Sequence, residues 1–191
     1  ASDVYKRQSV SSVLGSIIGY WLGKKWGRGL FNRYKAEKHL EKIEVIINLA
    51  GANIGAQKWS NKRKIELINS RVNSIQFLKQ TASKMPRLNY FISASGINCY
   101  GYNTQVEKEE SHEYGNDFLS ELVKEWEIAS SSFKEICPVA ILRIALVVDK
   151  KGGALKKIMK PIKLGLGSPL GTGQQYLPSV SYTHLRAHET K

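Results

Sequence analysis

The sequence of 191 residues has little of several features that usually decide a protein's class. Its two cysteines, Cys99 and Cys137, are too few for a disulfide framework and do not form a metal-ligand pattern. The apolar stretch Val13–Leu22 is shorter than the ~20 residues that a membrane-spanning helix needs. There is also no internal repeat and no low-complexity tract. These absences favour a globular protein with reduced thiols, which we expect in the cytoplasm and not in a membrane.

Acidic residues are scarce relative to basic ones. The chain has 16 Asp and Glu against 29 Lys and Arg, which gives a formal net charge of +13. Such an excess suits an anionic partner, either nucleic acid, a phosphorylated small molecule or an anionic surface. Basic and aromatic residues are not interleaved in one motif, so only the charge supports nucleic-acid binding. We therefore consider nucleic acid the less favoured partner.

The two ends of the chain differ from the middle. Residues 1–8 and 181–191 show no apolar periodicity, and both resemble translated adapter sequence, so we predict that they are artefacts. Residues 9–42 contain glycines at every fourth position (Gly15, Gly19, Gly23), a spacing that does not match a nucleotide-binding turn, and we assign them no function. Residues 43–180 are predicted to form one partial domain, and the chain is expected to be a fragment.

Strand-like and helix-like segments alternate through this central part. Three apolar stretches predict strands at Val45–Leu49, Tyr90–Ser95 and Val139–Val148. The first helix, capped by Ser60 or Asn61, and the second, capped by Asp117, are predicted from apolar residues at spacings of three and four. These are Ile65, Ile68, Val72, Ile75 and Leu78 in the first helix, and Leu119, Leu122, Trp126, Ala129 and Phe133 in the second.

Alternation of this kind predicts an α/β fold built from right-handed βαβ units. The three strands should be parallel neighbours, and the first should be buried on both faces because its apolar residues are nearly continuous. We therefore expect a partial Rossmann-like, doubly wound parallel sheet.

The first strand ends in an informative way. Its apolar run contains Asn48 and stops at Gly51, and an amide within such a run must be hydrogen-bonded. Gly51 permits a sharp turn or the close approach of another molecule. Ligands of open α/β sheets bind at the carboxyl ends of the strands. The stretch predicts a ligand-binding turn, with a purely structural asparagine as the alternative.

Six motifs in series resemble a known family. They are "VIINLAGANI", "KW" followed by "KRK" and "SRV", "FISASG" followed by "YG", "FLSELVKEWE", "LRIALVVDKKGGAL" and "PIKLGLGSPLGTG". In this order they are similar to the NAD(P)-dependent epimerase/dehydratase-like proteins of the atypical short-chain dehydrogenase/reductase superfamily. The narrower resemblance is to a sugar-nucleotide-epimerase-like group that carries a further C-terminal domain of unknown function.

The resemblance implies where a cofactor binds. NAD or NADP, in the full-length parent, is expected beside the first strand, where Asn48, Ala50 and Gly51 match the family motif. Ser93 is added as a cofactor-binding residue on the second strand.

The resemblance also implies a serine followed by a Tyr-x-x-x-Lys pair as the catalytic group. Ser95 occupies the serine position, and Ser93 should lie on the same face of the strand. The helix that should carry the pair has Leu119 and Val123 in its place. Tyr100 is the best remaining phenol, so Ser95 and Tyr100 are the predicted catalytic residues. Alternatively, the serines only satisfy backbone groups at the strand end.

Substrate-binding residues are predicted in the last third of the domain. Lys157 and Lys160 precede the loop "GLGSPLG" and could contact phosphates, although single lysines are often only solvated. Arg143 lies within an apolar strand, where a buried guanidinium needs a partner. No metal ligand is predicted.

The leading functional hypothesis is a fragment of an NAD(P)-dependent epimerase-like oxidoreductase that acts on a small molecule of the nucleotide-sugar kind. The fragment alone is expected to be inactive. The alternative is a non-catalytic protein of the same fold that binds or senses the dinucleotide, which the absent Tyr/Lys pair favours.

Overall fold

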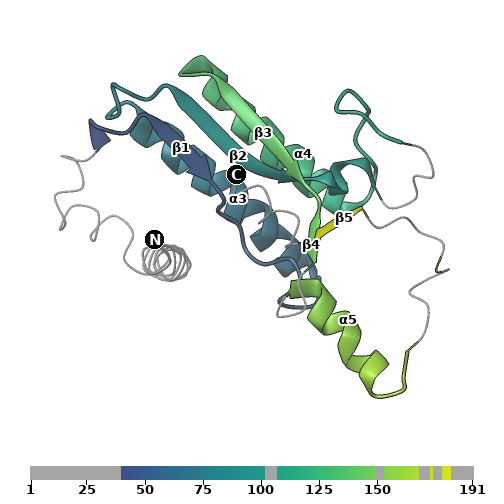
Figure 1. The fold of residues 1–191 in the computed structure, drawn as a ribbon. Coiled ribbons are helices and arrows are strands. Elements are labelled where there is room, and N and C mark those ends of the chain that lie inside the picture. Colours follow the sequence, from purple (N-terminus) through teal and green to yellow (C-terminus); the bar gives the residue numbers. More distant parts are fainter. Residues whose placement is uncertain (1–39, 102–106, 149–152, 168–172, 174–177, 182–191) are drawn as a thin grey trace, which may run out of the picture.

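The computed structural model describes residues 40–101, 107–148, 153–167, 173 and 178–181 (Figure 1). The described elements, in chain order, are β1 (Val45–Asn48), α3 (Asn61–Ala82), β2 (Tyr90–Gly96), the short 3-10 helix η1 (Ile97–Tyr100), α4 (Phe118–Ser131), the 3-10 helix η2 (Ser132–Glu135), β3 (Val139–Ile144), β4 (Leu146–Val148), α5 (Gly153–Lys163) and β5 (Ser179–Ser181). None of the helices within these residues is long and apolar enough to cross a membrane.

The main sheet has the strand order β1-β2-β3, and all its strands are parallel. β1 is followed by α3 before β2, and β2 is followed by α4 before β3, so the chain makes two successive βαβ connections. This confirms the predicted α/β class and the predicted parallel order. The carboxyl ends of all three strands therefore meet at one edge of the sheet.

The two long helices begin at the predicted caps. The Ser60 side chain accepts a hydrogen bond from the Arg63 backbone N–H at the start of α3. Asp117 accepts hydrogen bonds from the backbone N–H groups of Leu119 and Ser120 at the start of α4. These caps satisfy N–H groups that have no partner within the helix.

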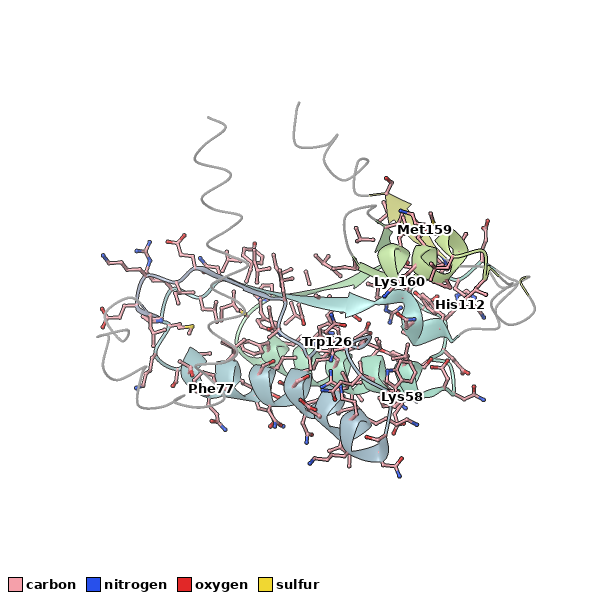
Figure 2. The ribbon with its side chains drawn as sticks, turned by 90° about the horizontal axis from the view of Figure 1, so that it is seen from below. Lys58, Phe77, His112, Trp126, Met159 and Lys160 are labelled. Atoms are coloured by element: carbon pink, nitrogen blue, oxygen red, sulfur yellow. The ribbon has the colours of Figure 1, made fainter. Side chains whose placement is uncertain are left out.

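α3 and α4 pack against each other and beneath the same face of the sheet (Figures 1 and 2). The core lies between the helices and that face. Phe91 of β2 stacks on Phe133 of η2 with ring centroids 3.9 Å apart, and both side chains are fully buried. Leu67 and Ile75 of α3 and Leu122 of α4 fill the rest of this layer.

The other face of the sheet is exposed over the described residues. Val45, Ile47 and Leu49 are 45%, 64% and 72% exposed, so the prediction that the first strand is buried on both faces is wrong for this part of the chain. The reason is that α3 and α4 lie on a single face. Other apolar residues exposed on the sheet strands are Tyr90, Leu142 and Ile144.

The third predicted strand is divided in two. β3 pairs with β2 as far as Ile144, which lies opposite Gly96. The chain of β2 turns into η1 after Gly96, so residues beyond Ile144 have no partner in the main sheet. They form β4, which pairs in parallel with β5 in a second, two-stranded sheet. β5 extends to Ser181, the first residue of the predicted artefactual tail.

The inner face of α3 also differs from the predicted apolar stripe. Ile75 is buried, and Ile68 and Leu78 pack partly buried against the core as predicted, but Ile65 is 60% exposed. Arg63 and Arg71 are buried instead, together with Leu67. The helix is therefore rotated so that two arginines face the protein, where they contact the turn after β1.

Candidate functional site

At the carboxyl ends of β2 and β3, several polar side chains form hydrogen bonds to one buried carboxylate. Glu127 of α4 is 5% exposed. Its Oε1 accepts hydrogen bonds from Ser95 Oγ at 2.5 Å and from Arg143 Nε at 2.9 Å. Its Oε2 accepts hydrogen bonds from Tyr114 OH at 2.6 Å and from Arg143 Nη2 at 2.9 Å. All four acceptor positions of the carboxylate are thus in use.

Arg143 links this carboxylate to Tyr100. Arg143 lies opposite Ser95 in the register of β2 and β3, at the end of the strand pair. Its Nη1 donates to Tyr100 OH at 2.7 Å and to the Glu110 carbonyl oxygen at 3.0 Å. The guanidinium also lies over the Tyr100 and Tyr114 rings, 5.1 Å and 5.6 Å from their centroids.

The charges of this cluster stabilise each other. Burial alone would raise the pKa of Glu127, but hydrogen bonds from Arg143, Ser95 and Tyr114 outweigh burial and lower it below its ordinary value. The hydrogen bonds to Glu127 in turn raise the pKa of Arg143 above its ordinary value. The pair is therefore ionised, and its geometry is that of a two-point contact between guanidinium and carboxylate. We call Ser95, Tyr100, Tyr114, Glu127 and Arg143 the Glu127 network.

The second part of the site is the turn after β1, residues 49–53. Asn48 is 4% exposed, and its Oδ1 accepts a hydrogen bond from the Ala50 N–H at 3.2 Å. The Ala52 N–H donates to Ser70 Oγ, and the Ala52 carbonyl oxygen accepts from Arg71 Nη2. The Asn53 carbonyl oxygen accepts from Arg63 Nη2 at 2.7 Å. The turn is thus held by three side chains of α3.

The turn combines an unsatisfied donor with a closely packed glycine. The Nδ2 group of Asn48 is buried and has no hydrogen-bond partner in the described structure, which leaves a donor unsatisfied. A Cβ atom at Gly51 would lie 2.9 Å from Arg71 Cζ, so only glycine fits there without a shift. The backbone of Gly51 itself is exposed.

Arg71 is a buried cation that no acidic residue accompanies in the described contacts. Besides Ala52, it donates to the Leu67 carbonyl oxygen, and its guanidinium lies 4.9 Å from the centroid of Trp126. Figure 2 shows Trp126 between the sheet and the helices. Burial, with a smaller contribution from the nearby Arg63 charge, lowers the pKa of Arg71 to about 10.

The predicted site residues fall into separate groups. Ser95, Tyr100 and Arg143 come together in the Glu127 network, and Asn48, Ala50 and Gly51 form the turn after β1. Ser93 shares the inner face with Ser95, as predicted, but is fully buried, and its Oγ lies 2.9 Å from Ser130 Oγ of α4.

The two predicted lysines cannot both be placed. Lys160 is exposed on α5 and takes part in none of the hydrogen bonds described above. The side chain of Lys157 lies outside the described residues.

Sequence reasoning missed Glu127, Tyr114 and Arg71. The need of Arg143 for a partner was recognised, and the partner is Glu127. The sequence contains a signal for Glu127, because Leu119, Val123 and Glu127 follow one another at intervals of four residues on α4. A charged residue on the inner face of a helix indicates a buried ionic contact.

A parallel sheet with crossover helices and polar residues at the carboxyl ends of its strands defines a Rossmann-type α/β domain. The chain matches no protein-family model. It is 31% identical over 147 residues to the mouse epimerase family protein SDR39U1, which covers 75% of this chain and 50% of the relative. It is 33% identical over 152 residues to the epimerase family protein SA0724 of Staphylococcus aureus, which covers 76% of this chain and 48% of the relative.

Solved structures agree with these relatives. The structure of human epimerase family protein SDR39U1 with NADPH is similar with a TM-score of 0.61 and 28% identity, over 73% of this chain and 48% of that one. The nucleoside-diphosphate sugar epimerase of Corynebacterium glutamicum is similar with a TM-score of 0.62 and 25% identity, over 80% of this chain and 32% of that one.

These similarities confirm the resemblance that the motifs of this chain predicted, to epimerase-like proteins of the atypical short-chain dehydrogenase/reductase superfamily. The chain spans about half the length of the relatives that it matches.

Proposed function

We propose that the protein to which this chain belongs is an NAD(P)-dependent oxidoreductase that interconverts a hydroxyl and a carbonyl group on a nucleotide-sugar-like substrate. The observation that carries the proposal is the Glu127 network, which puts a serine, two phenols and an ion pair at the carboxyl ends of β2 and β3. This is the edge at which open α/β sheets bind ligands. The human relative was solved with NADPH, which supports NAD(P) as the cofactor.

The turn after β1 would hold part of this cofactor. The unsatisfied Asn48 Nδ2 supplies a donor, and Ala50 and Gly51 leave the backbone accessible. Ser93 remains a proposed contact, although its full burial means that a ligand could reach it only if the inner layer opened.

The cofactor, when bound, supplies the acceptor or donor of a hydride. The chain supplies proton exchange and orientation. Tyr100 OH is the group proposed to exchange a proton with the substrate hydroxyl, and Ser95, which donates a hydrogen bond to Glu127, is proposed to lie beside the same substrate oxygen. Arg143, Lys157 and Lys160 remain the proposed substrate contacts, and phosphates of a nucleotide sugar suit the exposed cation of Lys160.

A second function, binding the dinucleotide without catalysis, is supported by one observation. Leu119 and Val123 occupy the positions where the superfamily has tyrosine and lysine, and both are buried against the core. They cannot transfer a proton. In that case the protein would bind and sense the dinucleotide without catalysing a reaction.

Hydride transfer decides between the two functions. The full-length protein is incubated with NAD⁺ or NADP⁺ and a panel of nucleotide sugars, and reduced nicotinamide is followed by absorbance. We expect turnover with at least one sugar, and a loss of about 100-fold or more in kcat for Tyr100→Phe. The matched control is Tyr90→Phe, which changes an exposed phenol at the opposite end of β2. Cofactor binding without turnover on any sugar would support the sensing function.

The predicted cytoplasmic location is likewise part of the proposal. Cys99 and Cys137 are both buried and free, as expected of thiols that are kept reduced.

A further inference from the structure

Two tyrosines contact the same ion pair with opposite hydrogen-bond polarity. Tyr100 OH accepts a hydrogen bond from the Arg143 guanidinium. Tyr114 OH donates a hydrogen bond to the Glu127 carboxylate. Both rings lie beside the Arg143 guanidinium, and the two phenols differ in exposure and in the group that their oxygens contact.

This difference places an N–H of a cation at one phenol oxygen and a carboxylate at the other. An N–H of a cation that points at a phenol oxygen stabilises negative charge on that oxygen. A carboxylate that accepts the phenol proton holds that proton in place. Burial, and then the hydrogen bond to Glu127, raises the pKa of Tyr114.

The contacts with Glu127 determine which nitrogen of Arg143 donates a hydrogen bond to Tyr100. The carboxylate takes Nε and Nη2, and this two-point contact fixes the plane of the guanidinium. Nη1 is thereby directed at Tyr100 and at the Glu110 carbonyl oxygen. The side chain of Arg143 is 17% exposed and that of Glu127 is 7% exposed, so water weakens the contact little.

We propose that Arg143, held by Glu127, is the positioning residue that prepares Tyr100 for proton exchange, and that Tyr114 takes no part in that exchange. This inference rests on the proposed function for its substrate. When a substrate CH–OH group is oxidised, the phenolate form of Tyr100 accepts the hydroxyl proton and becomes the phenol, the C–H electron pair leaves as hydride to NAD(P)⁺, and a C=O bond forms. In reduction, Tyr100 returns the proton to the oxygen. Arg143 keeps its own protons throughout.

Nitration of this chain by tetranitromethane tests the different roles of Tyr100 and Tyr114 without cofactor or substrate, because this reagent attacks phenolates. The rates at Tyr100 and Tyr114 are measured at neutral pH by mass spectrometry of peptides. We expect Tyr100 to be nitrated at least about tenfold faster, the ratio that one hydrogen bond to a charged group supplies. Exposure would favour the opposite order, because Tyr114 is an exposed residue and Tyr100 is not.

Variants of Arg143 separate positioning from general structure. Arg143→Met should reduce the rate ratio of Tyr100 to Tyr114 by about tenfold, and Arg143→Lys, which keeps a cation but loses the two-point contact, should give an intermediate ratio. Lys124→Met is the matched control, since it removes an exposed cation of α4 outside the network. If circular dichroism shows that Arg143→Met does not fold, the nitration rate ratios of Arg143→Lys and Arg143→Gln are used in its place.

Equal rates at the two tyrosines of the unmodified chain, or a ratio that folded Arg143 variants leave unchanged, would overturn the inference. The proposed function fails in a different way. In that case the full-length protein shows no hydride transfer while the nitration preference for Tyr100 persists.

Discussion

At the scale of single residues, the charge of Glu127 is the feature on which the polar network depends. Glu127→Gln removes the negative charge and leaves the Arg143 cation in a largely buried position. We expect a loss of about 3 kcal/mol in the free energy of unfolding, measured by urea denaturation near pH 7. The matched control is Glu125→Gln, which changes an exposed carboxylate of the same helix and should have little effect.

The same substitution should change the acid dependence of stability. Because the pKa of Glu127 is lowered in the folded protein, its stabilisation is fully present above the unfolded pKa of about 4.3 and is lost as the pH falls through the folded value. Glu127→Gln should lack this loss. An unchanged acid limb in the denaturation profile of the variant would contradict the network as described.

Gly51 allows a second prediction at this scale. Gly51→Ala would bring a Cβ atom against the Arg71 guanidinium, which is fixed by Leu67, Ala52 and Trp126. We expect a loss of about 1–2 kcal/mol in thermal or urea unfolding, typical of overpacking. Gly96→Ala is the control, because its Cβ would have no neighbour closer than 3.6 Å. Equal effects of the two substitutions would mean that Arg71 moves aside freely.

The residues that were predictable at the site are those with a local signature. Asn48 and Gly51 interrupt an apolar run, Ser95 ends a strand, and Arg143 is a charge within a strand. The partners Glu127 and Tyr114 were not predicted because they reach the site from α4 and from the loop before it. Their contacts depend on how α4 packs under β2 and β3, which is a tertiary property.

At the scale of elements, the cap of α4 is open to a direct test. Asp117→Ala removes the acceptor of the Leu119 and Ser120 N–H groups and should lower the free energy of unfolding by about 1 kcal/mol. Asp117→Asn retains an acceptor and should lose less. The matched control is Asn116→Ala, at the exposed position just before the cap. A loss as large for Asn116→Ala would indicate that the loop, and not the cap, is responsible.

The positions of helices and strands along the chain could be predicted from local sequence patterns. The burial and the pairing of these elements could not. Apolar runs and cap residues located β1 and β2 to within one residue, and they located the start of β3 and the starts of both long helices. The break between β3 and β4 is not visible in "VAILRIALVV", because it reflects the end of the neighbouring strand β2 at Gly96. The exposure of β1 likewise depends on which helices cover the sheet, and that is not encoded in the strand itself.

At the scale of the whole molecule, we predict that this chain of 191 residues binds NAD(H) or NADP(H) very weakly. No Gly-x-x-Gly-x-x-Gly occurs in its sequence, and the turn after β1 is proposed to hold only part of such a ligand. Several charge-assisted hydrogen bonds to a diphosphate, each worth roughly 1.5–3 kcal/mol, are then missing. Titration calorimetry should give a dissociation constant of about 1 mM or weaker.

A micromolar dissociation constant would contradict this prediction, because it would require a phosphate-binding turn outside the motifs identified here. The result would leave the fold and the Glu127 network unchanged.

The parallel pairing of the sheet has a consequence for how the chain reaches its fold. Val45 pairs with Tyr90, and Phe91 pairs with Val139, so each strand pair joins residues about 45 to 50 positions apart. Closing a loop of that length costs roughly 3 kcal/mol of chain entropy before any contact offsets it. The capped helices α3 and α4 need no such closure. They can therefore form early, and the rate of folding is set by the later step in which their common surface gathers β1, β2 and β3.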